Sequence, residues 1–277
     1  MFGGSGSHIP YMTINELSAA RNRIEFISKP ASVNMAEDWF EIATADHFWI
    51  RRRFDVVRNM LRGCDLSNWR VAEVGCGHGL VQRQFEQGFG VAVDGFELNL
   101  VSLEQNLSTR GRLLHYNVLE KRPEFRERYD LVLLFDVLEH IEHEEQFLDA
   151  ITFLAKDGGQ VLINVPALQG LYSRYDRRAG HLRRYSLPEL VNLVSAQGLQ
   201  VRVCTYWGLP LLPFLWVRKQ HLRFVRFEDV IRRGFDPGSK IVNQAMYLLS
   251  LAEPIPQRYC GTSAMLLARK PLEPRRS

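Results

Sequence analysis

Short runs of β-branched residues alternate with runs of helical periodicity along most of the chain. Strands that alternate with helices predict an α/β fold, in which a mostly parallel sheet is covered by helices on both faces. Such a sheet binds ligands at the carboxyl ends of its strands. The predicted strands are residues 70–74, 91–93, 112–116, 130–135, 160–165, 200–206 and 264–267, and the predicted helices between them are 80–87, 98–109, 142–155 and 187–197.

The composition is that of an ordinary globular protein. The chain has 277 residues, of which 46% are hydrophobic and 24% are charged, and these values exclude a disordered or collagen-like chain. No run approaches the roughly 18 apolar residues of a spanning helix, so an integral membrane protein is not predicted. The net charge of +4 is too small to indicate nucleic-acid binding by itself.

The four cysteines are scattered along the sequence. They form no C-x-x-C pair and have no histidine at zinc spacing, so no metal site is predicted. We interpret them as reduced thiols of a cytoplasmic protein, although the sequence leaves open that two of them meet in space. They are Cys64, Cys76, Cys204 and Cys260.

Changes in residue pattern divide the chain into five segments. The first twelve residues are rich in Gly and Ser and lack the features of a signal peptide, so we interpret them as an appended leader, with Met12 as the native start. Apolar residues at helical spacing over 36–62 predict one or two helices. The expected segments are the leader 1–12, an N-terminal helical cap 13–69, a core 70–207, a helical insert 208–260, and a closing strand with a basic tail 261–277.

The insert interrupts the alternation of strands and helices. It opens with an apolar stretch that contains Pro210 and Pro213 and then becomes basic. Residues 218–277 hold twelve Lys and Arg against five Asp and Glu, a net charge of +7. The insert is therefore read as a lid over an apolar substrate, as a dimer contact, or as a contact with an anionic membrane surface through 208–233. We favour the lid.

A glycine-rich turn follows the first strand of the core. Gly75, Gly77 and Gly79 let the backbone approach a flat ligand closely. Glu73 puts a carboxylate where a dinucleotide site keeps an apolar residue, and Leu80 stands where that site needs a small one. An anion site with an added carboxylate would repel its own ligand, so the turn predicts a site for a cationic ligand.

A second carboxylate follows the next predicted strand. Glu97 comes 22 residues after Gly75, and an ionised Glu can accept both hydroxyls of a ribose. Asp94 is the competing candidate, but it lies within the strand and before Gly95, where we expect a turn. Spacing favours Glu97.

These motifs resemble class I S-adenosylmethionine-dependent methyltransferases, and most closely the bacterial small-molecule branch that includes ubiquinone-type O-methyltransferases. The likeness rests on the turn at 73–79, on Gly95-Phe96-Glu97 and on the fourth strand with its following residues, 129–141. It covers about residues 70–205 and the closing strand. The resemblance implies a Rossmann-like, seven-stranded, mostly parallel sheet with an antiparallel last strand, and S-adenosylmethionine as cofactor, released as S-adenosylhomocysteine.

The resemblance also assigns cofactor contacts. Residues of the turn would line the methionine part, Glu97 would hold the ribose, and Leu98 would lie against the adenine. Asn117 stands where many members carry Asp, and it can still accept from the adenine amino group through its carbonyl oxygen. The full cofactor set is Glu73, Gly75, Cys76, Gly77, Glu97, Leu98, Asn117, Val118, Phe135 and Asp136, with Arg53 reaching the methionine carboxylate.

Candidates for binding the acceptor substrate lie in two places. One is the loop after the fifth strand, and the other is the N-terminal segment that precedes the core. A histidine exchanges a proton near neutral pH, so His181 is a candidate base for the acceptor hydroxyl, although it could instead only hold the loop. Asp136, Glu139 and His140 could simply cap the helix that starts near residue 142. The substrate candidates are His47, Trp49, Tyr172, Tyr175 and Tyr185.

The predicted function is methyl transfer to oxygen or nitrogen of a small or carrier-linked metabolite. An RNA methyltransferase is one alternative, but the signatures of base-modifying enzymes are absent from the sequence. A non-catalytic scaffold with the same fold is the other, and the matched turn and carboxylates argue against it. The sequence does not identify the acceptor. We expect a monomer or homodimer in the cytoplasm, with peripheral contact at the inner membrane face as an open option.

Overall fold

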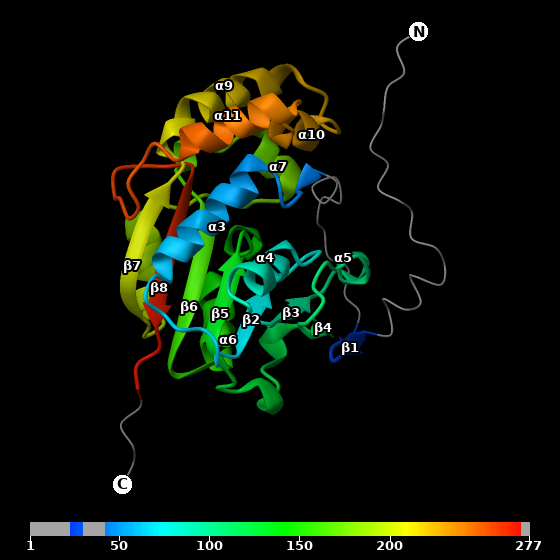
Figure 1. The fold of residues 1–277 in the computed structure, drawn as a ribbon, viewed down its shortest axis with the longest axis vertical. Helices are drawn as coiled ribbons and strands as arrows, with labels where there is room; N and C mark the ends of the chain where they lie inside the picture. The colour runs from blue at the N-terminus through cyan, green and yellow to red at the C-terminus, as the bar shows by residue number, and fades with distance from the viewer. Residues whose placement is uncertain (1–22, 30–41, 273–277) are drawn as a thin grey trace.

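A single eight-stranded sheet organises the structure, a computed structural model that describes residues 23–29 and 42–272. The strand order is β1-β4-β3-β2-β5-β6-β8-β7, and Figure 1 shows helices packed around the sheet. The strands are β1 (Ile24–Phe26), β2 (Val71–Val74), β3 (Val93–Glu97), β4 (Leu113–His115), β5 (Tyr129–Phe135), β6 (Ala155–Pro166), β7 (Gln200–Trp207) and β8 (Ser263–Arg269).

The topology confirms the predicted α/β, Rossmann-like fold. Strands β1 to β6 pair in parallel, whereas β8 runs antiparallel to both β6 and β7, as expected for the closing strand. The sheet has eight strands instead of seven because β1 adds to the edge beside β4. Strand β1 has only three residues, too few for an alternation of apolar and polar residues to be recognised in the sequence. It falls inside the segment expected to be a helical cap.

Helices connect the strands where the sequence predicted them, with two differences in extent. The helix expected over 98–109 is only α5, and residues 36–41 of the expected N-terminal helices lie outside the described residues. The α-helices are α3 (Phe48–Met60), α4 (Leu80–Gly88), α5 (Leu100–Glu104), α6 (Glu144–Leu154), α7 (Arg174–Ala179), α8 (Leu187–Ala196), α9 (Leu212–His221), α10 (Val230–Phe235) and α11 (Lys240–Ser250). The 3₁₀ segments are η1 (Val118–Glu120), η2 (Pro123–Phe125), η3 (Leu138–His140), η4 (Gln169–Leu171), η5 (Leu209–Leu211) and η6 (Leu222–Phe224).

The core lies on both faces of the sheet, because successive side chains of a strand point to opposite sides. In β5, Leu131 and Leu133 belong to one apolar cluster, which includes residues of α3 and α4. Val132 and Leu134 belong to the other cluster, which includes residues of α6 and α8. The apolar run of β5 is therefore buried on both sides and fixes the centre of the sheet.

Helices α9, α10 and α11 connect β7 to β8 and gather at one end of the molecule, at the top of Figure 1. Helix α11 is joined to α3: the Tyr247 hydroxyl donates to Asp55 at 2.8 Å, and the Arg51 guanidinium lies 3.6 Å from the Tyr247 ring centroid. None of the helices in the described residues is both long and apolar enough to cross a membrane.

We predict that Gly111→Ala destabilises the fold by about 2–4 kcal/mol. A Cβ at Gly111 would lie 1.8 Å from the Val93 carbonyl oxygen, so the backbone of β3 or of the loop would have to move. Gly170→Ala is the matched control, because a Cβ there meets nothing within 4 Å, and we expect it to change stability by less than about 0.5 kcal/mol. Urea unfolding measures both, and equal stabilities would contradict the close approach of the two segments.

Candidate active site

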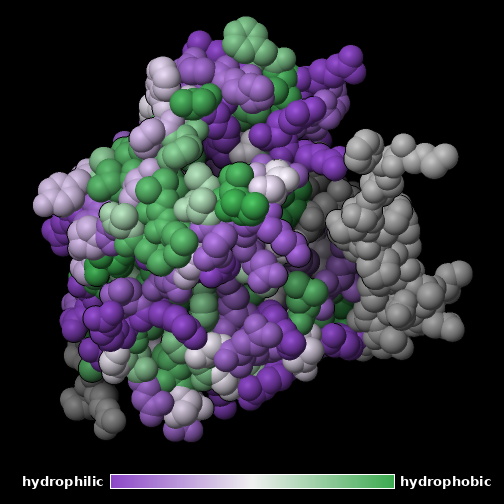
Figure 2. Space-filling model, turned by 45° about the horizontal axis from the view of Figure 1, so that its top comes forward, coloured by the Kyte–Doolittle hydropathy of each residue, from purple (hydrophilic) through white to green (hydrophobic). Residues whose placement is uncertain are grey.

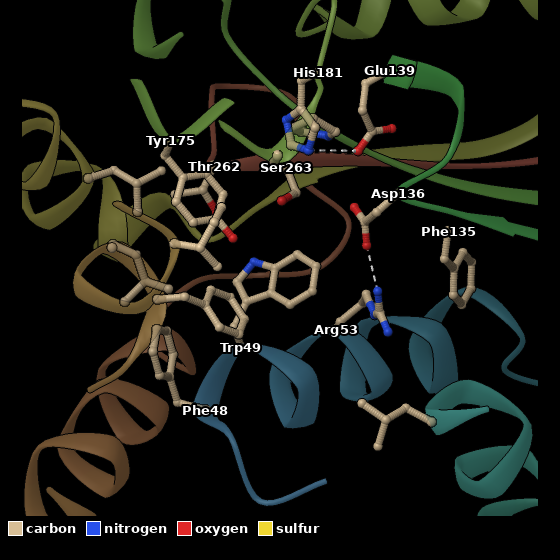
Figure 3. Close-up of a pocket in the computed structure, with 18 of the residues that line it drawn as sticks. Phe48, Trp49, Arg53, Phe135, Asp136, Glu139, Tyr175, His181, Thr262 and Ser263 are labelled. Atoms are coloured by element: carbon tan, nitrogen blue, oxygen red, sulfur yellow. Dashed lines mark hydrogen bonds and ion pairs between the residues drawn. The ribbon is translucent and has the colours of Figure 1, made fainter. Parts of the chain in front are cut away.

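A cavity of about 420 Å³ opens at the carboxyl ends of β2, β5 and β6 (Figure 3). Its floor is the glycine-rich turn and the end of β5, and apolar residues of α3, α9, α10 and α11 close the remaining sides. Polar groups concentrate on the sheet side, which is the distribution of a site that orients one reactive end of a ligand. The polar and charged lining residues include Arg53, Glu73, Asp136, Glu139, His140, Tyr175, His181, Arg184, Arg218 and Asp236.

The turn between β2 and α4 can be made only with glycine at its first position. Gly75 has φ +73°, and a Cβ there would lie 2.4 Å from a methyl group of Val137. Its N–H and that of Cys76 both donate to the Phe96 carbonyl, at 2.8 and 3.2 Å. The turn is therefore held against the end of β3, and its residues Gly75, Cys76 and Gly77 line the cavity.

The Glu97 carboxylate ties the turn to the end of β3. One oxygen accepts from the Gly77 N–H at 2.9 Å, and the other accepts from Leu98 and Asn99 at 2.7 and 2.8 Å. Burial raises the pKa of Glu97, while these N–H donors act to lower it. Two oxygens offer about four acceptor positions, so one position remains for a ligand hydroxyl.

Asp94, the competing carboxylate, interacts with neighbouring residues of the sheet rather than with the turn. It accepts from the Tyr129 hydroxyl at 2.9 Å and lies 3.6 Å from an Arg112 nitrogen. The expected turn at Gly95 is wrong, because Gly95 lies within β3 and pairs with Glu73 and Leu113. Glycine is needed there for packing, since a Cβ would lie 2.7 Å from the Cys76 sulfur.

Glu73 is a buried carboxyl at the cavity wall. It is 3% exposed, and no hydrogen bond from the described residues reaches its Oε2. Burial raises the pKa of Glu73 to about 8, against the opposing pull of the Arg53 charge. A buried polar atom without a partner is costly, so this oxygen is a group that a ligand with N–H donors or positive charge would satisfy.

Asp136 ends β5 in a conformation that a non-glycine residue rarely takes, with φ +56°. Its carboxylate accepts from Arg53 at 2.5 Å (Figure 3) and from the Asn164 amide at 2.8 Å. Burial raises the pKa of Asp136, and the Arg53 charge opposes that shift. Strained backbone held by side-chain bonds is common at functional sites, where it fixes a side chain in one orientation.

His181 reaches the cavity from the loop after α7. Its Nδ1 lies 3.1 Å from Asp176, and its Nε2 lies 3.9 Å from a Glu139 oxygen. Asp176 also accepts from the Arg184 Nε at 2.7 Å. Although burial acts to raise it, the bonds from His181 and Arg184 hold the pKa of Asp176 below its usual range, so the carboxylate is ionised and fixes the imidazole.

The cavity brings together most of the residues singled out from the sequence. Of the cofactor candidates, Glu97 lies behind the turn, and Leu98, Asn117 and Val118 lie outside the cavity wall. The Asn117 side chain accepts from the Leu119 N–H at the start of η1. The candidates that line the cavity are Trp49, Arg53, Glu73, Gly75, Cys76, Gly77, Phe135, Asp136, Tyr175 and His181.

Three of the predicted substrate residues have other partners and lie outside the cavity wall. His47 caps α3 and bonds to the Phe235 carbonyl at 2.9 Å. The Tyr172 hydroxyl donates to the His181 carbonyl, and the Tyr185 hydroxyl donates to Glu144 at 2.5 Å and lies 3.1 Å from the Leu138 carbonyl. These side chains hold α3 and the loop in place, and their assignment to the substrate stays a prediction.

Sequence reasoning missed Glu139 and His140 as site residues, because they read as caps of the following helix. In fact His143 is the N-cap of α6, and no side chain caps that helix. Glu139 and His140 belong to η3 and line the cavity beside His181. The signal that was available is a Glu-His pair directly after a buried strand, where the carboxyl ends of a parallel sheet place ligand-binding groups.

The comparisons with known proteins agree with this geometry. The family model described as a methyltransferase domain matches residues 16–203. The ubiquinone biosynthesis O-methyltransferase of Rickettsia felis is 29% identical over 104 residues, which are 36% of this chain and 42% of the relative. This chain thus covers less than half of the length of that relative.

Two solved structures share the fold. Phosphoethanolamine N-methyltransferase 2 of Haemonchus contortus, in complex with phosphomonomethylethanolamine and S-adenosylhomocysteine, has a TM-score of 0.51 at 16% identity, over 80% of this chain and 53% of that one. The [4+2]-cyclase SpnF has a TM-score of 0.53 at 16% identity, over 93% and 92%. The family model spans more than half of the chain, and the motifs and fold agree with it. The protein therefore belongs to the S-adenosylmethionine-dependent methyltransferase family.

Proposed function

We propose that this chain transfers a methyl group from S-adenosylmethionine to oxygen or nitrogen of a small or carrier-linked metabolite. The observation that carries the proposal is the glycine turn between two buried carboxyls, one of which has an unpartnered oxygen. A sulfonium cofactor brings the positive charge and the ribose hydroxyls that these groups would bind. No specific feature of the site favours the RNA-methyltransferase or scaffold alternative.

In this proposal the methionine part lies along the glycine turn, between Glu73 and Arg53. Glu97 holds the ribose, and Leu98, Asn117 and Val118 surround the adenine. The transferred methyl group lies near Phe135 and Asp136, at the end of β5. Support comes from Gly75, Cys76 and Gly77, which all line the cavity.

The reaction is an in-line displacement at the methyl carbon. A lone pair of the acceptor forms the new bond, the carbon–sulfur bond breaks, and its electron pair stays on sulfur, which becomes neutral. The acceptor proton passes to His181, whose imidazole is held by the ionised Asp176. The remaining requirements are alignment and exclusion of water, and the apolar walls of the cavity serve both.

We propose that the helices α9, α10 and α11 form a lid over the acceptor. Leu211, Phe214, Phe235 and Met246 from this region line the cavity, and Arg218 of α9 lies 4.6 Å from the Tyr175 ring centroid. An apolar acceptor would therefore be enclosed between the lid and the sheet.

Peripheral membrane contact is the second role that we propose for residues 208–233, through the outer face of the lid. We propose that the protein itself is cytoplasmic. Phe224 is 89% exposed and is flanked by Arg223 and Arg226. In Figure 2 hydrophobic side chains gather in patches between hydrophilic ones. Co-sedimentation with anionic vesicles separates the two roles, because a lid alone does not pellet with them.

Glu97→Gln is expected to weaken S-adenosylmethionine binding about 10–100-fold. The amide keeps the shape of the side chain but loses one acceptor and the charge that hold the ribose and the Gly77 N–H. Asp94→Asn is the matched control and should stay within about threefold of wild type, because Asp94 contacts Tyr129 and Arg112. Calorimetry gives both affinities. If Asp94→Asn weakens binding and Glu97→Gln does not, the ribose assignment is wrong.

Glu73 predicts a pH-dependent stability of the cofactor-free protein. Its pKa rises from 4.5 to about 8 on folding, so between these values the folded state binds more protons than the unfolded state. The stability that protonated Glu73 contributes is present at low pH and is lost as pH rises through about 8. Glu73→Gln, which stays neutral, should match wild type near pH 4 and exceed its stability at pH 9 by a few kcal/mol, since each pKa unit is worth roughly 1.4 kcal/mol.

Urea unfolding at pH 4, 7 and 9 tests this dependence. Glu127→Gln is the control for the loss of one carboxylate, because Glu127 is not among the residues that line the cavity and is half-exposed. If the stabilities of Glu73→Gln and wild type differ by the same amount at all three pH values, the raised pKa of Glu73 is contradicted.

His181→Ala is expected to lower the turnover of a hydroxyl acceptor by about 10²–10⁴-fold while the affinity for S-adenosylmethionine stays near that of wild type. The reason is that the imidazole takes the acceptor proton but is not among the residues assigned to the cofactor. A screen of acceptors coupled to S-adenosylhomocysteine release provides the assay. Turnover by the variant within a few-fold of wild type would end the base proposal.

A further inference from the structure

A second cavity, of about 400 Å³, lies between α7 and the first part of the lid. Two cationic side chains from each of these segments line it, and the residues concerned are Arg174, Arg177, Lys219 and Arg223. Tyr172 and Ser173 complete the lining, and none of the described lining residues is acidic. Because cations that share one small concavity repel each other, the cavity favours a ligand with several negative charges.

Two of the four cations are held in position by backbone carbonyls. The Arg174 Nη1 donates to three carbonyls between residues 222 and 225, at 2.7–3.0 Å. The Lys219 Nζ donates to the Gly170 carbonyl at 2.6 Å. These bonds orient both side chains across the boundary between α7 and the lid. Carbonyl oxygens carry no net charge, so the two positive charges are not neutralised.

The charge of the cavity is not balanced by acidic side chains. In the part of the chain that the structure describes, none of the four cations forms an ion pair with a carboxylate. By contrast, Arg183 and Arg184, a few residues after α7, each pair with an acidic side chain. Arg177 and Arg223 are exposed and can turn toward a ligand. The cavity therefore combines two fixed cations with two movable ones.

The lining of this cavity also holds the candidate base of the active site. The Tyr172 hydroxyl donates to the His181 carbonyl at 2.8 Å. The Ser173 hydroxyl donates to Asp176 at 3.1 Å, and Asp176 in turn lies 3.1 Å from the His181 Nδ1. A ligand in the second cavity would thus contact the residues that position His181 from behind.

We propose that this cavity binds the phosphate or diphosphate group of a soluble ligand, and that the bound anion links α7 to the lid. Arg binds phosphate through paired N–H groups, and Lys binds it as a point charge. A volume of about 400 Å³ is that of a small-molecule site. No aliphatic residue is among its described lining residues, so nothing there would hold an acyl chain, which favours a soluble ligand over a phospholipid.

The bound anion would change the contact between α7 and the lid. Because two cations come from each side, neutralising them removes a repulsion and adds bonds from both segments to one group. The lid would then be held more firmly over the acceptor cavity. That last consequence rests on the proposed function, whereas anion binding itself does not.

Calorimetry with sodium pyrophosphate at low ionic strength tests the site without any turnover. We expect one equivalent to bind, and sodium chloride of equal ionic strength to give no such heat. Arg177→Gln and Arg223→Gln should each weaken binding about tenfold. Neither side chain makes a hydrogen bond within the described residues, so their loss leaves the fold intact. Arg233→Gln is the matched control and should stay within about twofold of wild type, because Arg233 is exposed on α10 and outside the cavity.

Hydrogen exchange with and without pyrophosphate tests the link between α7 and the lid. We expect the anion to slow exchange at least threefold in residues 174–179 and 212–224 of wild type. The same addition should have little effect on Arg177→Gln, which removes one of the two α7 cations.

The proposal is overturned if wild type binds no pyrophosphate, or if Arg177→Gln and Arg223→Gln bind it as tightly as wild type. It is also overturned if Arg233→Gln weakens binding as much as they do, or if phosphatidylglycerol vesicles bind at these residues and pyrophosphate does not. Unchanged exchange in the two segments contradicts the link between them. Calorimetry with S-adenosylmethionine is scored separately, because failure to bind the cofactor contradicts the proposed function and leaves the anion site standing.

Discussion

The site depends on one interaction, the acceptance of three backbone N–H groups by the buried Glu97 carboxylate. A single side chain thereby connects the end of β3 to the turn after β2. Because a buried charge is tolerated only when it is well hydrogen-bonded, these bonds hold both the carboxylate and the turn in place. Gly75 and Gly77 are thereby held in place in the cavity wall.

Acidic side chains recur around that cavity. Glu73, Asp136 and Glu139 all line it, and burial raises the pKa of each. Arg53 balances Asp136, but Glu73 and Glu139 keep carboxylate oxygens without hydrogen-bond partners among the described residues. The wall therefore has an unbalanced preference for positive charge at two separate places. A sulfonium cofactor would satisfy the first.

The sequence could predict what depends on neighbours along the chain. Strand and helix alternation gave the sheet, and the spacing from Gly75 to Glu97 pointed to the turn and its carboxylate. It could not predict β1, which is held by pairing with β4, or the place of Gly95 inside β3. Tyr185 and His47 looked like site residues because polar aromatic groups bind ligands, yet tertiary contacts use them as supports. The approach of Glu139 to His181 depends on how two loops pack, which no local pattern reports.

The most direct test of the account is a crystal structure with S-adenosylhomocysteine bound. We predict one molecule at the turn, with a ribose hydroxyl on Glu97, its amino acid end beside Glu73, and its sulfur near the end of β5. A ligand-free cavity at saturating S-adenosylhomocysteine, or a nicotinamide dinucleotide bound at the turn in its place, would contradict the central claim.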